Sequence, residues 1–172
     1  MPISMYTASV PVFIKTLGNM AKWLDKAEAY AEATKFDPSV YMTLRLAPDM
    51  LPLPSQIRIA ADAAKGAAAW LAGMEIPVFE DNETSIAELR ERIRKCTGFL
   101  ATVQEKDFAG AEERRVAPSW LGGRWLRGGD YLVHVAVPNF FFHVTMAYAI
   151  LRHNGVVLGK ADYIGGMPTL EG

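Results

Sequence analysis

Apolar residues recur at intervals of three and four along two stretches in the first half of the chain, and each stretch predicts a helix. The first runs from Ser4 to Thr34. Pro11 lies within it, and because a helix interior disfavours proline, we expect this residue near the start or at a kink. The second runs from Ser55, a candidate cap, to Ala72, with Gly73 ending it.

The third predicted helix has the clearest start signal. Ser85 and Glu88 have the spacing of a capping box, in which each side chain binds the other residue's backbone N–H. Apolar residues follow at helical spacing, and the helix is expected to end near Lys106. Cys96 belongs to this apolar pattern, so we interpret it as a small core residue rather than a reactive thiol.

The most apolar part of the chain predicts a fourth helix, from Asp130 to His153, as the central helix of the core. Pro138 lies inside it and predicts a kink, because its ring removes one backbone donor. Residues 131–137 also alternate with a period of two, so a strand before Pro138 is the alternative. Asn139 and His143 are four positions apart and are expected to be the only polar groups on the inner face.

The connector between the first two helices, residues 36–55, contains four prolines, which are too close together for one continuous helix. It is nevertheless rich in Leu and Met, so we expect it to lie against the core, with a short helical turn around Ser39 to Leu44. Arg45 and Asp49 lie in this connector and could pair with each other.

The segment before the fourth helix predicts a β-hairpin. Two short runs, which carry Trp120 and Trp125, flank Gly122 and Gly123. Pro118 would confine its strand to an edge of the sheet. We expect both tryptophans to cover the bundle rather than bind a ligand.

Length and composition narrow the classes of function. A chain of 172 residues is most simply one domain, residues 1–172. Its net charge of -1 gives no reason to expect nucleic acid or an anionic membrane as a partner. A single cysteine excludes an internal disulfide and suits a reducing compartment. No signal peptide is recognised, and the polar interruptions favour a core helix over a membrane span, so we expect a cytoplasmic protein.

Five segments together resemble an uncharacterised bacterial family, a domain of unknown function, within the DinB/YfiT-like superfamily. The segments are Arg45 to Met50, Gln56 to Asp62, Pro138 to His143, Ala147 to Arg152 and Gly159 to Asp162. The resemblance implies a mainly α fold, an up-down four-helix bundle with a short β-hairpin or extended segment between helices three and four. It also implies frequent dimerisation, so we expect a homodimer.

Many members of that superfamily hold a divalent metal with three histidines, one on helix two and two on helix four. The resemblance places these positions at or near Asp62 and at Asn139 and His143, so only one histidine is retained. Asp62 and His143 are the candidate metal ligands; Asn is a poor ligand for a transition metal. The cofactor expected is a divalent metal or none.

Each candidate site residue also has a structural interpretation. His143 could be a core histidine bonded to Asn139, Asp62 or a backbone carbonyl, and Asp62 could be a solvated carboxylate between Arg58 and Lys65. The candidate ligand-binding residues are Asp62, Asn139, His143, Arg45 and Asp49.

Three functions are consistent with the sequence. The first is small-molecule or divalent-metal binding at a degenerate site in the bundle, where the resemblance also allows a hydrolase or thiol-transferase activity. The second is a metal-free small-molecule binder whose pocket is lined by Phe140, Phe142, Trp and Met residues. The third is a homodimeric interaction protein without catalytic activity. No residue pair resembles a nucleophile with its base, and no glycine-rich phosphate loop occurs, so no catalytic residue is predicted.

Overall fold

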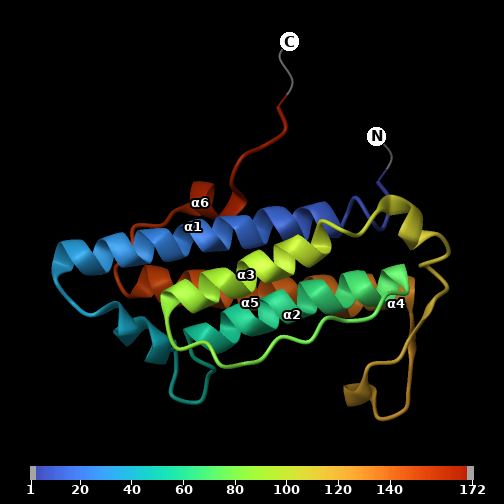
Figure 1. The fold of residues 1–172 in the computed structure, drawn as a ribbon, viewed down its shortest axis with the longest axis horizontal. Helices are drawn as coiled ribbons and strands as arrows, with labels where there is room; N and C mark the ends of the chain where they lie inside the picture. Colours follow the sequence, from blue (N-terminus) through green and yellow to red (C-terminus); the bar gives the residue numbers. More distant parts are fainter. Residues whose placement is uncertain (1–2, 170–172) are drawn as a thin grey trace.

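The computed structural model describes residues 3–169 and contains the expected bundle of four long helices (Figure 1). Around the bundle, α1 lies next to α3 and α5, and α2 lies next to α3 and α5. The expected mainly α fold, a bundle of four long helices, is therefore confirmed. The long helices are α1 (Val10–Thr34), α2 (Leu53–Ala72), α3 (Ile86–Leu100) and a continuous helix made of α4 (Gly128–Tyr131), a π-helical turn (Leu132–Ala136) and α5 (Val137–His153).

Shorter elements connect these helices. Two two-residue strands pair antiparallel, with Val116 opposite Leu126. The short elements are three 3-10 turns (Pro38–Thr43, Glu105–Phe108 and Ser119–Leu121), β1 (Arg115–Val116), β2 (Leu126–Arg127) and α6 (Lys160–Ile164). The turn expected around Ser39 to Leu44 is confirmed, whereas α6 was not expected.

Helices α2 and α3 run in the same direction, although they are consecutive (Figure 1), which differs from the expected up-down order at this step. Residues 73–85, which we call the return loop, lead the chain back along the bundle between them. The loop stays close to the helices: Arg92 on α3 donates to the carbonyl oxygen of Glu80 at 3.0 Å.

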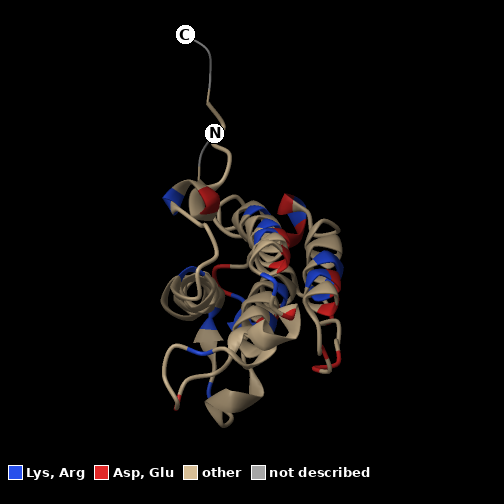
Figure 2. Cartoon of the chain, turned by 90° about the vertical axis from the view of Figure 1, so that its left-hand side faces the viewer, with Lys and Arg blue, Asp and Glu red and all other residues tan. Residues whose placement is uncertain are grey.

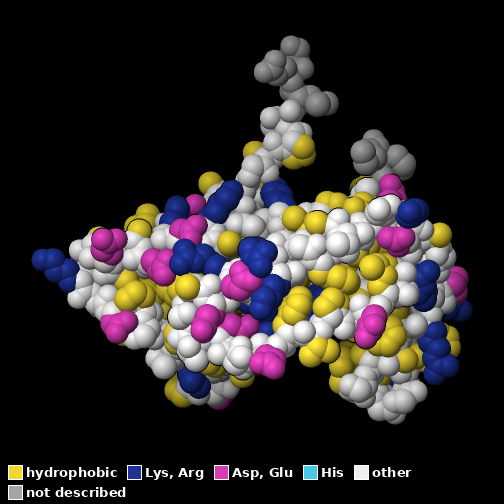
Figure 3. All heavy atoms as spheres, viewed as in Figure 1, with side chains coloured by type: hydrophobic (Ala, Val, Ile, Leu, Met, Phe, Trp, Pro, Cys, Tyr) yellow, Lys and Arg dark blue, Asp and Glu magenta, His cyan; other side chains and the backbone are white. Residues whose placement is uncertain are grey.

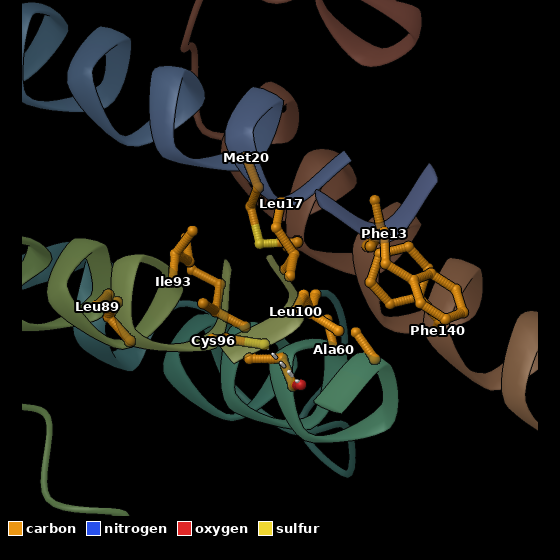
Figure 4. Close-up of a cluster of buried hydrophobic side chains, with 14 of the residues drawn as sticks. Phe13, Leu17, Met20, Ala60, Leu89, Ile93, Cys96, Leu100 and Phe140 are labelled. Carbon is orange, nitrogen blue, oxygen red and sulfur yellow. Dashed lines mark hydrogen bonds between the residues drawn. The ribbon is translucent and has the colours of Figure 1, made fainter. Parts of the chain in front are cut away.

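The core lies between the four helices (Figure 4). Phe13 on α1 meets Phe140 on α5 with ring centroids 4.6 Å apart. The alanines of α2 allow close packing, and the Cys96 thiol donates to the carbonyl oxygen of Ala61 at 3.2 Å. Burial raises the pKa of Cys96 to about 12, so its expected role as a core residue is confirmed.

The ends of the first three long helices agree with the sequence except at three points. The Ser85 side chain accepts from the backbone N–H of Glu88 at 3.2 Å, as expected for a cap. However, α2 begins two residues before Ser55, with a proline in its first turn where no donor is lost. Helix α1 begins at Val10, which places Pro11 in its first turn. Helix α3 ends at Leu100, earlier than Lys106.

The predicted hairpin exists, but its tryptophans lie outside the strands. Trp120 sits in the 3-10 turn between the strands, and Trp125 precedes β2. Trp120 is 62% exposed, so the expectation that the tryptophans cover the bundle is wrong. Pro118 precedes that turn rather than occupying an edge strand.

Residues 131–137 are helical, so the alternative of a strand before Pro138 is wrong. The helix starts at Gly128, before the expected cap Asp130. A Cβ at residue 128 would overlap the carbonyl oxygen of Ala111, so only glycine fits. Next to Pro138 the helix widens into a π turn, in which the Val137 N–H donates to the carbonyl oxygen of Leu132. A wider turn accommodates the donor that proline lacks.

The fourth helix flanks the bundle instead of passing through its centre. Phe140 is buried, but Phe142 is 52% exposed. In Figure 2, α5 forms the left edge of the bundle and its outer side is almost free of charge. By length and composition the segment Gly128–His153 is apolar enough to cross a membrane, and 33% of its most apolar window is buried. Its inner face packs on α2, as in the core helix of a helical domain, so it is no clear membrane span.

The C-terminal segment is fastened to α1. Asp162 on α6 forms an ion pair with Lys26 at 2.7 Å, and the Trp23 indole donates to the Asp162 carbonyl oxygen at 3.0 Å. Val156 and Leu158 are buried, so the expected packing of the first half of this segment is confirmed.

Candidate functional site

A groove of about 690 Å³ runs along the outer side of α2, and we call it the α2 groove. In Figure 3 the lower edge of the molecule is indented between the return loop and the segment that joins β1 to β2, which form its two walls. Its lining residues come from α2 (Ile59, Asp62, Ala63, Lys65, Gly66, Trp70), from the return loop (Ile76, Pro77, Val78, Phe79, Asp81) and from the segment before and within the last helix (Pro118, Trp120, Tyr131, Val135, Ala136, Asn139).

Small residues of α2 create the floor of the groove. Ile59, Asp62 and Gly66 lie on one stripe of the helix, as their spacing predicts, and all three line the groove. Apart from its chain neighbours and the nearby backbone of its own helix, a Cβ at Gly66 would meet no atom of residues 3–169 within 4 Å, so the space above this residue is open. The groove is therefore formed by missing side-chain volume on α2 between two walls that carry aromatic rings.

Ion pairs hold the return loop against α2 and α3. The Arg92 guanidinium, 1% exposed, contacts Asp62 at 2.9 Å, Asp81 at 3.0 Å and Glu83 at 3.0 Å. Arg58 contacts the second oxygen of Glu83 at 3.1 Å. We call Arg58, Asp62, Asp81, Glu83 and Arg92 the Arg92 cluster. It holds the return loop, which is one wall of the groove, against α2 and α3.

The charged residues of the groove bind one another. The Lys65 ammonium lies 2.7 Å from Asp62 and 4.3 Å from the centre of the Phe79 ring, a cation–π distance. Asp62 and Asp81 both contact Arg92. The groove therefore presents charges that are already neutralised by neighbours.

Two neutral polar side chains of the groove have no partner within residues 3–169. Tyr131 is 7% exposed, and its hydroxyl makes no hydrogen bond there. The hydroxyl of Tyr41 is sealed in the interior, whereas that of Tyr131 is not enclosed and Tyr131 lines the groove. Burial raises the pKa of Tyr131 to about 12, so it is a neutral donor at pH 7. Asn139 is exposed at the groove and makes no hydrogen bond with the described part of the chain.

His143 lies one turn beyond Asn139 and does not line the groove. It is 8% exposed, and its Nδ1 is 2.8 Å from Oε1 of Gln56 on α2. The Gln56 amide donates through Nε2 to the carbonyl oxygen of Leu51 at 3.0 Å, which leaves Oε1 as the acceptor for His143. The neutral imidazole therefore carries its proton on Nδ1. Loss of solvation lowers the pKa of His143, which favours this neutral form.

The structure brings Asp62 and Asn139 together in the α2 groove and places the other predicted residues elsewhere. His143 binds Gln56, which corrects the expectation of a bond to Asn139, Asp62 or a backbone carbonyl. Asn139 is exposed, so it is not on the inner face as expected.

Arg45 and Asp49 are exposed in the connector, apart from the groove, and Arg45 donates to the carbonyl oxygen of Met50 at 3.5 Å. The expected Arg45–Asp49 pair is not formed within residues 3–169. The aromatic lining also differs from the expectation, because Phe140 is in the core and Phe142 is exposed on α5.

The donor set does not fit a divalent metal. Both oxygens of Asp62 face cations, Arg92 and Lys65, and would have to leave them to bind a metal. Asn139 offers only an amide, a poor ligand for transition metals. Between residues 3 and 169, no group of three or more His, Cys, Asp or Glu side chains could hold a metal ion.

Sequence reasoning missed Gln56, Arg92 and Tyr131. Gln56 is a polar residue on the buried face of an alanine-rich helix, and this was a usable signal. Arg92 stands between the core positions Leu89 and Ile93 rather than on the charged face, but its partners come from the return loop and could not be inferred. Tyr131 stands at the start of the most apolar run of the chain, and nothing in the sequence distinguishes it from its apolar neighbours.

The comparisons with known proteins agree with this architecture. The family model described as "Domain of unknown function (DUF1993)" matches residues 5–164. A solved structure of a DinB family member from Shewanella denitrificans is 42% identical in sequence and superposes with a TM-score of 0.93, covering 97% of this chain and 95% of that one. No curated protein matches the sequence. The chain belongs to the DUF1993 family and shares its fold with a DinB family member.

Proposed function

We propose that the protein binds a small, largely apolar molecule in the α2 groove. The observation that carries this proposal is the groove itself: about 690 Å³ of open space with four aromatic side chains in its lining (Trp70, Phe79, Trp120 and Tyr131). Ligand sites typically have such volumes, apolar walls and a few polar groups that fix orientation.

The return loop and the last helix, which both line the groove, are held in place by contacts with the rest of the protein, which supports a binding site rather than a fortuitous gap. The return loop is fixed by the Arg92 cluster, and the last helix, which contributes Tyr131 to the groove, starts at Gly128, which is held close to the Ala111 backbone. The groove is therefore formed before a ligand arrives, which lowers the entropic cost of binding.

The test fills the groove without disturbing the fold. Gly66→Leu places a larger side chain where a Cβ meets nothing, and leucine also has a higher helix propensity than glycine. We expect wild-type protein to raise the fluorescence of the uncharged dye N-phenyl-1-naphthylamine, and Gly66→Leu to reduce its affinity at least about tenfold. Titration of the dye at a fixed protein concentration measures both.

Gly98→Leu is the matched control. Gly98 is an exposed helical glycine on α3, outside the groove, and a Cβ there also meets nothing within 4 Å. This variant should bind the dye like wild type. Equal dye affinity of Gly66→Leu and Gly98→Leu, or no binding to wild type, would overturn the proposal.

A second candidate function is assembly, and the occupant we propose for the outer face of α5 is a second copy of the chain. No charged residue occurs between Asp130 and Arg152, and both of these end residues are exposed. Antiparallel pairing of two such helices would align each Asp130 with the other copy's Arg152 and leave apolar residues such as Phe142 between them. The face is therefore complementary to itself in charge and in polarity.

Size-exclusion chromatography with light scattering tests this assembly. Wild type should elute as a dimer and Phe142→Glu as a monomer, because the new carboxylates would meet across the interface. Val157→Glu, at an exposed apolar residue beyond the C-terminal end of α5, should remain a dimer. A monomeric wild type would remove this candidate and leave the groove proposal unaffected.

A further inference from the structure

From the polar groups of the α2 groove we infer that its ligand is an uncharged, flat molecule that presents a hydrogen-bond acceptor to the hydroxyl of Tyr131. This inference rests on the proposed function and specifies the ligand class. It follows from three features of the groove: which polar groups have partners, which do not, and where the most exposed ring lies.

The first feature is that the charged side chains of the groove already form ion pairs with neighbouring residues. Asp62 lies between Lys65 and Arg92, and Asp81 also contacts Arg92. A charged ligand would lose its hydration without gaining a free counter-charge, or would have to separate an existing pair. Because an unpaired charge is costly in an apolar site, the groove disfavours carboxylates and amines as ligands.

The second feature is the open hydroxyl of Tyr131. This side chain is more than nine-tenths buried, lines the groove and has no hydrogen-bond partner in residues 3–169. Because this hydroxyl opens to the groove instead of being enclosed in the interior, a ligand in the groove is positioned to supply its partner. Since the hydroxyl remains protonated at neutral pH, the complementary group is an acceptor such as a carbonyl oxygen.

The third feature is Trp120, which lines the groove from the wall opposite the return loop. Most of this ring is exposed although it lines the groove. A flat ligand that stacks on it would cover apolar surface that the protein leaves open. Stacking does not depend on an acceptor group, so Trp120 and Tyr131 have separable contributions.

The experiment uses four probes with one ring system and different polar groups. 2-Acetylnaphthalene has an uncharged acceptor, naphthalene has none, 2-naphthoate is an anion, and 2-naphthylmethylammonium is a cation. Each displaces N-phenyl-1-naphthylamine from the full-length protein. We expect 2-acetylnaphthalene to bind most tightly, and the two charged probes at least about tenfold more weakly.

Two variants assign the contributions. Tyr131→Phe should weaken 2-acetylnaphthalene about threefold to tenfold, the value of one neutral hydrogen bond, and leave naphthalene unchanged. Trp120→Ala should weaken both probes by a similar factor. Tyr148→Phe is the control, because Tyr148 packs against Trp23 and Tyr163, away from the groove. It should behave like wild type.

The outcomes separate this inference from the proposed function. If wild type binds the dye and Gly66→Leu does not, but 2-naphthoate or the amine competes as well as 2-acetylnaphthalene, the groove binds ligands and the inferred class is wrong. The same holds if Tyr131→Phe has no effect on 2-acetylnaphthalene. If wild type binds no dye, both the function and the class are overturned.

Discussion

Polar side chains on the two sides of α2 differ in how completely they are paired with other groups of the protein. Toward α3 and the return loop, the cation of Arg92 contacts three carboxylates and a backbone carbonyl. Toward the last helix, Gln56 and His143 bind each other, but Tyr131 and Asn139 at the groove have no partner between residues 3 and 169. Groups that satisfy one another hold a structure together, whereas groups left open are available to a ligand. This difference supports our proposal that the groove is the ligand-binding side of the bundle.

The largest effect is expected from removing the cation that three carboxylates share on the α3 side of α2. Arg92→Leu leaves the carboxylates of Asp62, Asp81 and Glu83 facing each other without their shared cation. Asp62 and Asp81 are partly exposed, which reduces the penalty, so we expect a loss of about 2–4 kcal/mol in the free energy of unfolding. Urea denaturation followed by circular dichroism measures it.

Arg94→Leu is the control for that substitution. Arg94 lies on the same helix, and its ion pair with Glu91 is largely exposed. This variant should change the free energy of unfolding by less than about 0.5 kcal/mol. If the two variants were equally stable, the Arg92 cluster would not be what holds the return loop.

A smaller effect is expected at the polar pair between α2 and α5. Gln56→Leu leaves the buried Nδ1–H of His143 without an acceptor and should cost about 1–3 kcal/mol in the free energy of unfolding. The double variant with His143→Leu should cost less than the sum of the single variants, because neither unpaired group remains. Additive losses in urea denaturation would show that the two side chains do not depend on each other.

The smallest expected effect is the contribution of His143 to the pH dependence of the free energy of unfolding. The folded-state pKa of His143 is lowered from 6.5, so the unfolded chain binds the proton first as pH falls. The free energy of unfolding should therefore decrease as pH falls from about 7 through 6.5 toward the folded-state pKa, and level off below it. His143→Gln should lack this component. Parallel stability curves for wild type and His143→Gln between pH 7 and 5 would contradict the assignment.

The helices could be predicted from the sequence because their signals are local. Ser85 with Glu88, Gly73 after α2 and the apolar spacing of α1 each specify an element within a few residues. The α6 turn was missed because its main support is distant: the indole of Trp23 and the ammonium of Lys26 bind it from α1.

The candidate site was predicted only in part, for the same reason. The stripe of Ile59, Asp62 and Gly66 on α2 could be inferred from helical spacing, and it does line the groove. The walls could not, because the return loop and Trp120 reach α2 through long-range packing. Apolar content alone also misplaced Phe142, since a hydrophobic helix can lie at the flank of a bundle with one face exposed.

Cys96 gives the protein an internal reporter of its own unfolding. The only thiol of the chain is fully buried, binds a backbone carbonyl and has a pKa near 12. Because thiolates are the species that react with alkylating reagents, modification in native conditions requires an opening of the core between α2 and α3. The alkylation rate would therefore measure that opening in unmodified protein. New cysteines placed on the groove walls for spectroscopic labels would react selectively while Cys96 stays protected.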